Sequence, residues 1–295
     1  MMGNILDGKQ TSLDLQDEIA RKVKSITASG GKKPHLAAVL IGNDAASKAY
    51  VGHKIKACAK AGFESTIISR DSNISQTELL QIVAELNCDE SIDGFIVQLP
   101  LPDHLNSDEV LQAVSIEKDV DGFHPESVGR MALGLPGFLP ATPAGILTLL
   151  KRYRIKTNGM HAVIVGRSDI VGNPIAALLR KNADPGNCTV TQCHSRTINL
   201  RDHTLRADIL IVAVGKPNFI TSDMVKEGAV VIDVGINRID DPSRKSGARL
   251  TGDVDFEHVA PKCSWITPVP GGVGPMTIAS LLENTLQASL SNAKS

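Results

Sequence analysis

The chain has 295 residues, of which 42% are apolar and 21% are charged, and its formal net charge at pH 7 is −1. This composition predicts a soluble globular protein with room for two domains, and an aromatic content of 3% with so little net charge argues against nucleic-acid binding. No apolar run is long enough to span a bilayer, and the first ten residues resemble neither a secretory signal nor a transit peptide, so we expect a cytoplasmic protein.

Short apolar segments alternate with longer helical patterns along the chain. In the first half, strands are expected at 35–42, 65–69 and 93–102, with helices at 49–63 and 76–87. In the second half, strands are expected at 161–166, 188–194, 207–215 and 228–235, with helices at 175–182 and 276–290. Wholly apolar strands between helices are typical of parallel sheets covered on both faces. We therefore predict an α/β protein with two α/β domains, separated within the Gly/Pro-rich passage 129–145.

The five cysteines form no Cys-x-x-Cys pair. Cys58, Cys188 and Cys193 lie within apolar patterns, where a buried free thiol is the usual state of a cysteine. We therefore expect reduced, buried thiols at these three positions.

The stretch VIVGRSDIVGNP (163–174) predicts a strand, a glycine-bounded turn and the start of a helix. Gly166 permits a tight turn, Gly172 permits close approach of helix to strand, and the free amides of a helix start favour a pyrophosphate. The third glycine of the dinucleotide fingerprint is absent, so the alternatives are a nucleotide loop and a purely structural turn.

The following strand ends in CHSRT (193–197), without the acidic residue that usually holds the ribose of NAD. Ser195 and Arg196 suit a phosphate oxygen, and Arg167 adds a second cation that can grip a phosphate with two hydrogen bonds. If the loop binds a dinucleotide, we therefore expect NADP in preference to NAD.

The helix at 49–63 divides into three stripes at about 100° per residue. An apolar stripe predicted to face the core comprises Val51, Ile55, Cys58 and Ala59. A polar stripe predicted to face solvent comprises His53, Lys56 and Lys60. A third stripe, predicted at the margin of the core, comprises Tyr50, Lys54, Ala57 and Ala61. Lys54 is thus either an incidental neighbour of Tyr50 or an active-site lysine under an aromatic ring.

A Tyr-x-x-x-Lys pair also occurs in short-chain dehydrogenases, but there it follows the glycine-rich loop within one domain. Here Tyr50 precedes Gly166 by more than a hundred residues, so that interpretation is excluded.

Further polar candidates lie where strands are expected to end, the usual binding edge of a parallel sheet. Gln98 follows an apolar run, and Asp121 lies in a loop where it is either a ligand or a turn-capping residue, a role open equally to Asp119. The stretch ITPVPGGVGPMT (266–277) is predicted to be a shaped loop, followed by a helix that begins near Pro275.

Nine stretches of the sequence closely resemble, in order, the bifunctional methylenetetrahydrofolate dehydrogenase/methenyltetrahydrofolate cyclohydrolase family. They span residues 50–277 and are YVGHKIKACAKAGF, GFIVQLPLP, KDVDGFHP, TPAGI, VIVGRSDIVGNP, AVGKPNFI, VIDVGIN, GDVDF and TPVPGGVGPMT. The resemblance implies a folate-binding catalytic domain (1–141 plus 273–295), a Rossmann-type NADP-binding domain (142–272) and an active-site cleft between them. It also implies a homodimer, tetrahydrofolate derivatives as substrates, and no metal.

The resemblance also implies roles for individual residues. Lys54 matches the catalytic lysine, Gln98 the glutamine that works with it, Tyr50 the ring that packs on the folate, and Asp121 the carboxylate that holds the pterin. Further substrate-binding positions are implied at Val97, Leu99, Pro270, Gly271, Gly272, Gly274 and Pro275. Cofactor-binding positions are implied at Gly166, Arg167, Ser168, Ile170, Ser195, Arg196 and Ile236.

Two other functions remain open for this chain, and one segment differs from the family. The chain could be a dehydrogenase without the hydrolase step, or a non-catalytic regulator that binds NADP or folate. The link 181–190 is longer than in many bacterial members, and its composition predicts a surface turn.

If Lys54 accepts a proton during hydrolysis, it has to be partly desolvated, because only the neutral amine is a base.

Overall fold

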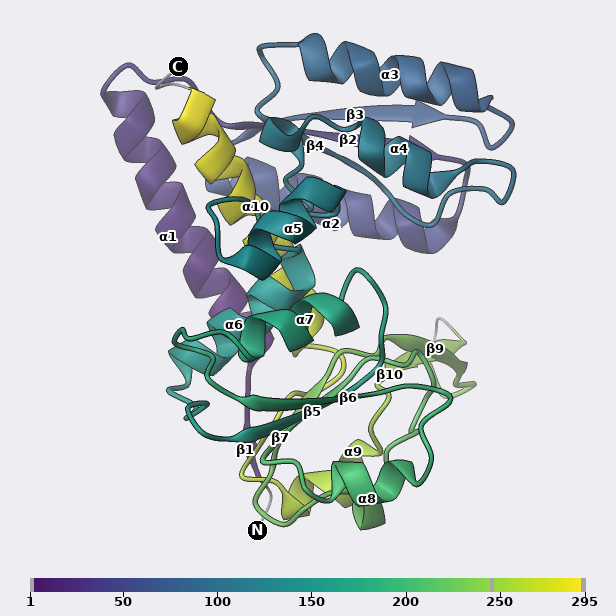
Figure 1. Cartoon of the computed structure of the whole chain (residues 1–295). Coiled ribbons are helices and arrows are strands. Elements are labelled where there is room, and N and C mark those ends of the chain that lie inside the picture. The colour runs from purple at the N-terminus through teal and green to yellow at the C-terminus, as the bar shows by residue number, and fades with distance from the viewer. Residues whose placement is uncertain (1–2, 245–246, 293–295) are drawn as a thin grey trace. The chain divides into compact units, whose positions relative to one another are not determined.

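The computed structural model describes residues 3–244 and 247–292 and has the expected α/β secondary structure (Figure 1). The helices are α1 (Gly8–Ala28), α2 (Ala45–Ala61), α3 (Gln76–Cys88), α4 (Ser107–Ala113), α5 (Pro125–Leu133), α6 (Ala141–Arg152), α7 (Gly172–Leu179), α8 (Leu200–Thr204), α9 (Phe256–Val259) and α10 (Val273–Asn292). The strands are β1 (Asn4–Ile5), β2 (His35–Ile41), β3 (Glu64–Arg70), β4 (Gly94–Val97), β5 (His161–Val165), β6 (Thr189–Cys193), β7 (Ile209–Val212), β8 (Val230–Asp233), β9 (Asn237–Asp240), β10 (Ala248–Thr251) and β11 (Trp265–Ile266).

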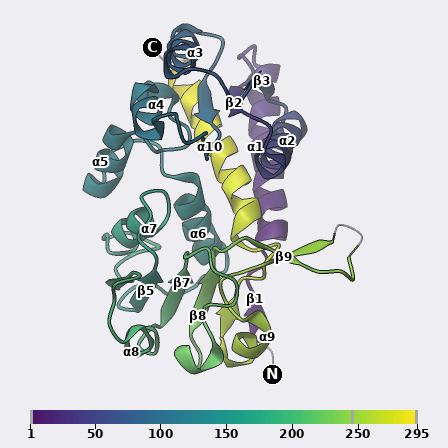
Figure 2. The same cartoon turned by 90° about the vertical axis from the view of Figure 1, so that its right-hand side faces the viewer.

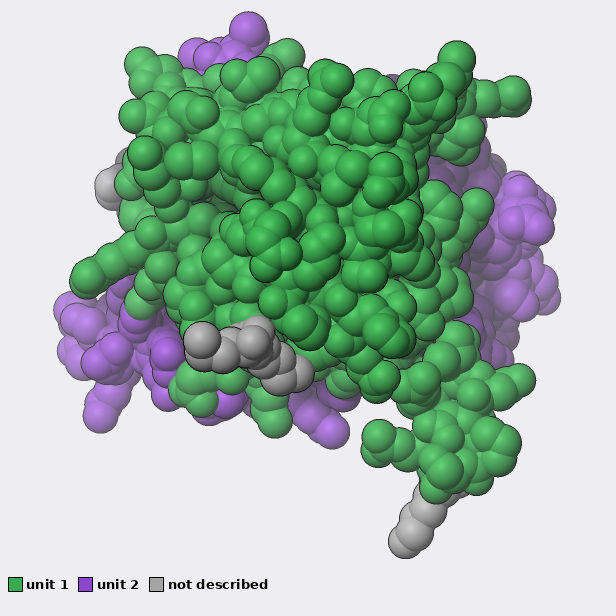
Figure 3. Space-filling model, turned by 90° about the horizontal axis from the view of Figure 1, so that it is seen from below, with its two compact units in different colours: residues 1–12, 142–277 green, residues 13–141, 278–295 purple. Residues whose placement is uncertain are grey.

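The described chain forms two compact units, coloured separately in Figure 3. Unit 1 comprises the described residues of 1–12 and 142–277, and unit 2 those of 13–141 and 278–295. The first residues join unit 1 because β1 pairs with β11 and the Lys9 amide donates to the Gly271 carbonyl at 2.8 Å. Contacts alone assign no function to a unit, so the division into a folate-binding and a cofactor-binding domain stays a prediction.

Unit 1 is built on a six-stranded sheet in the order β1-β11-β8-β7-β5-β6, and every neighbouring pair in it is parallel. The chain runs from β5 to β6 on one side and then to β7 on the other side of β5. Ligands of open parallel sheets bind at such a reversal of strand order, outside the carboxyl ends of the strands. An antiparallel ribbon of β9 and β10 extends away from this sheet (Figure 2).

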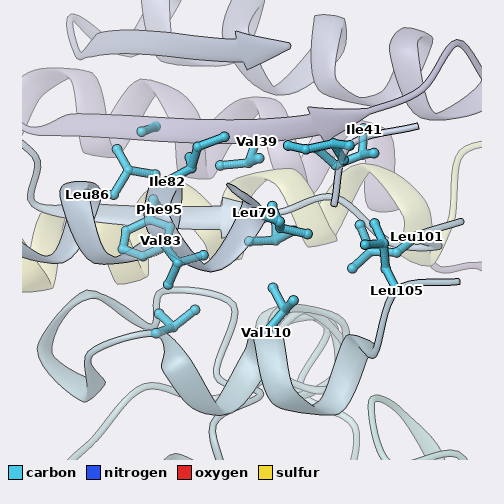
Figure 4. Packing of buried hydrophobic residues seen from close by; sticks show 14 of the residues in the cluster. Val39, Ile41, Leu79, Ile82, Val83, Leu86, Phe95, Leu101, Leu105 and Val110 are labelled. Carbon is cyan, nitrogen blue, oxygen red and sulfur yellow. The ribbon is translucent and has the colours of Figure 1, made fainter. Parts of the chain in front are cut away.

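Unit 2 has a three-stranded parallel sheet in the order β3-β2-β4, with the same reversal around its central strand β2. Its core lies between this sheet and helices α3 and α4, where Phe95 and Val83 are among the packed side chains (Figure 4). The predicted cover on both faces is wrong for β3, because this edge strand is largely exposed and Ile67 retains 47% of its accessible surface.

Several predicted boundaries are corrected. The strand predicted at 93–102 ends at Val97, since prolines follow that cannot donate to a sheet. Helix α7 begins three residues before the predicted 175, and α10 begins at Val273 rather than near Pro275. Both helices start early because a proline in the first turn lacks only an N–H that would have no partner there.

Helix α1 was missed altogether, although the sequence carries a signal for it. Leu15, Ile19 and Val23 are buried and lie four residues apart, as the apolar face of a helix requires. The link 181–190 is a surface turn only in part, because Pro185 and Gly186 are buried and the Gly186 amide donates to Thr157 Oγ1 at 2.9 Å.

The predicted state of the cysteines is confirmed. Cys58, Cys188 and Cys193 are buried free thiols, and burial raises the pKa of Cys58 to about 12.

A cluster of polar side chains, here called the polar corner, lies at the amino-terminal ends of the strands in the unit 2 sheet, which we call its amino edge. The His35 amide donates to Asp93 Oδ2 at 2.8 Å, and His35 Nε2 lies 2.9 Å from Thr66 Oγ1. Lys32 Nζ lies 3.0 Å from Asp93 Oδ1. These contacts join the start of β2 to both neighbouring strands.

The same corner recurs in unit 1. The His161 amide donates to Asp208 Oδ2 at 2.9 Å, and His161 Nε2 lies 2.9 Å from Thr191 Oγ1. Lys226 forms an ion pair with Asp208. Each histidine begins a central strand and reaches a threonine two residues further along the neighbouring strand, so the two sheets share this register.

Candidate functional site

Helix α2 places Lys54 in the centre of its buried face. The helix begins at Ala45 with Asp44 accepting from the Ser47 amide, and it ends at Ala61, where Gly62 caps it with a left-handed φ of 80°. Its buried residues lie along one face of the helix and are Ser47, Val51, Lys54, Ala57, Cys58 and Ala61. The Lys54 side chain is thus in the core, with 5% of its surface exposed.

The stripes predicted for this helix are partly wrong. Ala59 is exposed and Ile55 only half-buried, whereas Ala57 and Ala61 are buried. The small side chains of the third stripe let that face of the helix pack closely, which moves Lys54 from the margin into the core. The polar stripe is confirmed, because His53, Lys56 and Lys60 are exposed.

Two groups hold the amino group of Lys54. Its Nζ donates to Gln98 Oε1 at 3.2 Å and lies 4.9 Å from the centre of the Tyr50 ring. Gln98 lies directly after β4, and its Nε2 donates to the Leu99 carbonyl at 2.7 Å, so its oxygen faces the lysine. Val97 is buried behind this pair, whereas Leu99 is half-buried.

Burial lowers the pKa of Lys54 below its ordinary value of 10.5, against the smaller opposing effect of the Asp121 carboxylate. Removal from water raises the pKa of Asp121, and the Lys54 charge opposes that rise. The Tyr50 ring also favours a cation. The desolvation of Lys54 is the largest of the effects on its pKa, so the site favours the neutral amine more than water does.

The two candidate aspartates, Asp119 and Asp121, lie in the loop after the short helix at 116–118 and have different contacts. Asp119 is buried and its carboxylate accepts from the Phe123 amide at 3.1 Å and the His124 amide at 2.9 Å. Asp119 therefore caps this turn. Asp121 is half-buried and interacts electrostatically with Lys54.

The glycine loop predicted at 163–174 is tightly packed in unit 1. Gly166 has a φ of 136°, and a Cβ there would lie 2.3 Å from the Ala213 carbonyl oxygen. A Cβ on Gly172 would lie 2.5 Å from the Gly166 carbonyl oxygen. The loop thus requires glycine at both positions, and Ser168 Oγ accepts from the Gly172 amide at 3.3 Å. These close approaches shape the turn at the start of α7 where a pyrophosphate would lie.

A cavity of about 230 Å³ lies at the carboxyl ends of β5 and β7. Gly166, Arg167 and Ser195 line it together, as do Lys216 and Phe219, which sequence analysis missed. Two cations beside an aromatic ring suit a phosphorylated nucleotide. The signal for Lys216 was available, because it follows the apolar run of β7. Ser168, Ile170 and Arg196 are exposed on the same loops.

The loop predicted at 266–277 lies in unit 1. Its first residue, Ile266, ends β11, and its residues from Val273 onward already belong to α10. Ser12 Oγ donates to the Pro275 carbonyl at 2.8 Å, and Gly8 packs so closely that its Cβ would lie 1.8 Å from the Gly272 carbonyl oxygen. Gly274 approaches Ile236, the exposed residue after β8. Pro270 and Gly271 complete the loop. It is therefore fixed by the first helix and adjoins a predicted cofactor contact.

No three histidine, cysteine, aspartate or glutamate side chains within residues 3–244 and 247–292 are grouped so that they could hold a metal ion. None of the helices in this described part combines the length and apolar character that a membrane crossing requires.

Comparison with known families decides the relationship. The model for the tetrahydrofolate dehydrogenase/cyclohydrolase catalytic domain matches residues 6–121, and that for the NAD(P)-binding domain of the same proteins matches residues 140–293. The chain belongs to the tetrahydrofolate dehydrogenase/cyclohydrolase family.

Individual members of this family agree with the assignment. The bifunctional protein FolD of Cytophaga hutchinsonii is 61% identical over 96% of this chain and 98% of its own length. The FolD dehydrogenase/cyclohydrolase structure from Campylobacter jejuni is 48% identical, with a TM-score of 0.91, and the match covers 98% and 99% of the two chains. The Trypanosoma brucei FolD structure, complexed with NADP cofactor and inhibitor, is 34% identical, with a TM-score of 0.94 and full coverage of both chains.

Burial of Lys54 predicts a pH dependence of stability. Because its pKa is lowered in the folded state, the unfolded protein holds more protons between that lowered value and 10.5, so stability rises with pH across this window. The free energy of unfolding of the wild type should therefore rise relative to that of Lys54→Met between pH 7 and pH 10, measured by urea denaturation. Lys56→Met, at an exposed position of the same helix, is the control. A constant difference between the wild type and Lys54→Met would contradict the burial argument.

Proposed function

We propose that this family member oxidises 5,10-methylenetetrahydrofolate to 5,10-methenyltetrahydrofolate with NADP and then hydrolyses the product to 10-formyltetrahydrofolate, within one-carbon metabolism. The observation that carries the proposal is a buried Lys54 hydrogen-bonded to Gln98 in a chain that matches both domains of the family. A buried lysine of lowered pKa supplies the base that the hydrolytic step requires.

NADP is proposed in preference to NAD. Arg167, Ser195 and Lys216 line one cavity, and the described loop after β6 carries no acidic residue where NAD sites usually have one. The Trypanosoma brucei relative is complexed with NADP. When bound, NADP supplies the acceptor for the hydride that leaves the methylene carbon.

The chain's own residues position the substrate and handle its protons. We assign Tyr50 to packing on the folate and Asp121 to the pterin, since Asp119 is already committed to its turn. The oxidation yields a delocalised cation and needs no base, so positioning is the main contribution to that step. Within unit 2, Val97 and Leu99 are proposed as further folate contacts.

Hydrolysis needs a proton acceptor for the attacking water. Neutral Lys54 donates one N–H to Gln98 Oε1, which leaves its lone pair free for a proton of that water. A cationic substrate nearby would lower the pKa of Lys54 further. Gln98 is itself held by the Leu99 carbonyl, so it keeps the amine aimed.

We further propose a cytoplasmic homodimer that binds neither nucleic acid nor membrane and uses no metal. These features are proposed from the net charge of −1 and the family resemblance. A dehydrogenase without the hydrolase step is the second candidate, and the assays below separate the two.

The direct test is an absorbance assay of methenyltetrahydrofolate. With methylenetetrahydrofolate as substrate, the wild type should form the product with a lower KM for NADP than for NAD, because the cations of the cavity bind the additional phosphate. Supplied methenyltetrahydrofolate should disappear without any cofactor. A lower KM for NAD would refute the NADP preference, and absence of cofactor-independent hydrolysis would favour the dehydrogenase-only alternative.

Lys54→Met should abolish hydrolysis, with a loss of about 10²- to 10⁴-fold as expected for a missing general base, and should greatly weaken the dehydrogenase. Both rates are measured by the same absorbance change, with Lys56→Met as the matched control on the exposed face. Normal hydrolysis by the Lys54→Met variant would rule out the assigned role.

Asp121→Ala should raise the KM for methylenetetrahydrofolate about tenfold or more without a comparable loss of stability, because the pterin loses a carboxylate acceptor. Asp119→Ala, which strands two backbone amides, should instead lower the free energy of unfolding by about 1–3 kcal/mol. Substrate kinetics and urea denaturation of both variants distinguish the roles, and an unchanged KM in Asp121→Ala would move the pterin contact elsewhere.

A further inference from the structure

Two buried carboxylates in unit 1 have no role in the mechanism above. Asp233 ends β8 with 3% of its surface exposed, and Asp253 precedes α9 with 0% exposed. They lie in the stretches VIDVGIN and GDVDF, which belong to the family resemblance. A buried carboxylate is costly unless hydrogen bonds replace its hydration, so the donors around this pair show what it organises.

Asp253 binds three consecutive backbone amides of the loop after β7. Its Oδ2 accepts from the Val214 amide at 2.6 Å and the Gly215 amide at 2.9 Å, and its Oδ1 accepts from the Lys216 amide at 2.9 Å. Successive amides that converge on one anion fix the path of a loop. The loop fixed in this way carries Lys216 into the cavity that Arg167 and Ser195 also line.

The same carboxylate also binds the residue at which the loop after β8 ends. Its Oδ1 accepts from Asn237 Nδ2 at 2.8 Å. Asn237 is the first residue of β9 and directly follows Ile236, a predicted cofactor contact. One oxygen of Asp253 is therefore shared between the loops that follow two neighbouring strands of the sheet.

Asp233 holds Asp253 in place. Asp233 Oδ1 accepts from the Asp253 amide, and its Oδ2 from the Val254 amide, each at 2.9 Å. The surrounding backbone leaves no room: a Cβ on Gly252 would lie 1.8 Å from Asp233 Oδ2, and a Cβ on Gly235 would lie 2.2 Å from Asp253 Oδ1. The network is thus closely packed as well as hydrogen-bonded.

We infer that Asp253 is a positioning residue for the cofactor: its carboxylate ties the Lys216 loop to the Ile236 loop and so sets the spacing of the two loops that a bound NADP has to contact. This inference rests on the proposed function. Asparagine at 253 would keep the size of the side chain but would turn an NH₂ group toward N–H donors. Because each carboxylate oxygen accepts two of the four bonds, two of them would be lost.

The test measures NADP binding by calorimetry and hydrolysis of methenyltetrahydrofolate without NADP. Asp253→Asn should raise the NADP Kd about tenfold or more, because displaced positioning groups have effects of this size, and should leave the cofactor-independent hydrolysis within about twofold of the wild type. The matched control is Asp208→Asn, which removes a carboxylate that accepts a backbone amide at the opposite edge of the same sheet. Its NADP Kd should be unchanged.

A second variant covers the case in which Asp253→Asn does not fold. Asn237→Ala removes one bond to Asp253 and leaves its three backbone bonds, so the NADP Kd or the hydride-transfer kcat should worsen about three- to tenfold. Wild-type values for both in Asn237→Ala, or an unchanged NADP Kd in folded Asp253→Asn, would overturn the inference. Equal weakening in Asp208→Asn would also overturn it, because the effect would then be a general loss of stability. A wild type that fails to bind NADP would refute the proposed function first, and the inference with it.

Discussion

The desolvation of one amino group is the constraint on which the candidate catalytic site depends. Lys54 occupies a position of α2 at which spacing and packing call for an apolar side chain. The cost of burying its charge appears as a lowered pKa, and a lower pKa raises the share of the neutral amine, the only form of lysine that can act as a base. Gln98 and Tyr50 orient the amine but do not replace the hydration that it loses on burial. The loss of hydration at Lys54 therefore costs folding free energy and, at the same time, favours the neutral amine that the proposed function requires.

Both units place their functional groups by the same topological rule. In each parallel sheet the order of the strands reverses at one strand, β2 in unit 2 and β5 in unit 1. Gln98 follows the neighbour of β2, and the cavity with Arg167 follows β5 and its neighbour β7. Loops that leave adjacent parallel strands at such a reversal diverge and leave room for a ligand. The order of the strands therefore determines where a ligand has room, and the side chains of the loops determine which ligand fits.

Local patterns predicted much of this arrangement, and long-range contacts accounted for most of what was missed. Apolar runs located the main strands, and helical spacing and two glycines singled out Lys54 and the loop at 163–174. The roles that the resemblance implies for these residues stay predictions. The choice between Asp119 and Asp121 required the turn geometry, because both residues fit the same sequence signal. The role of Asp253 was invisible, since its partners lie 16 to 39 residues away. Ala59 was misplaced because hydrophobicity alone does not show which small residues pack.

The recurring corner of histidine, aspartate, threonine and lysine has a consequence for how such a protein can change. In both units these four side chains clamp the amino edge of the sheet. The candidate chemistry lies at the carboxyl edge, a strand length away. These contacts align the strands from the end opposite to the candidate sites, so mutations in the loops at the carboxyl ends can change a ligand without breaking them. The two sheets can thus keep the same strand register while their loops diverge, one set toward the candidate lysine site and the other toward the candidate nucleotide site.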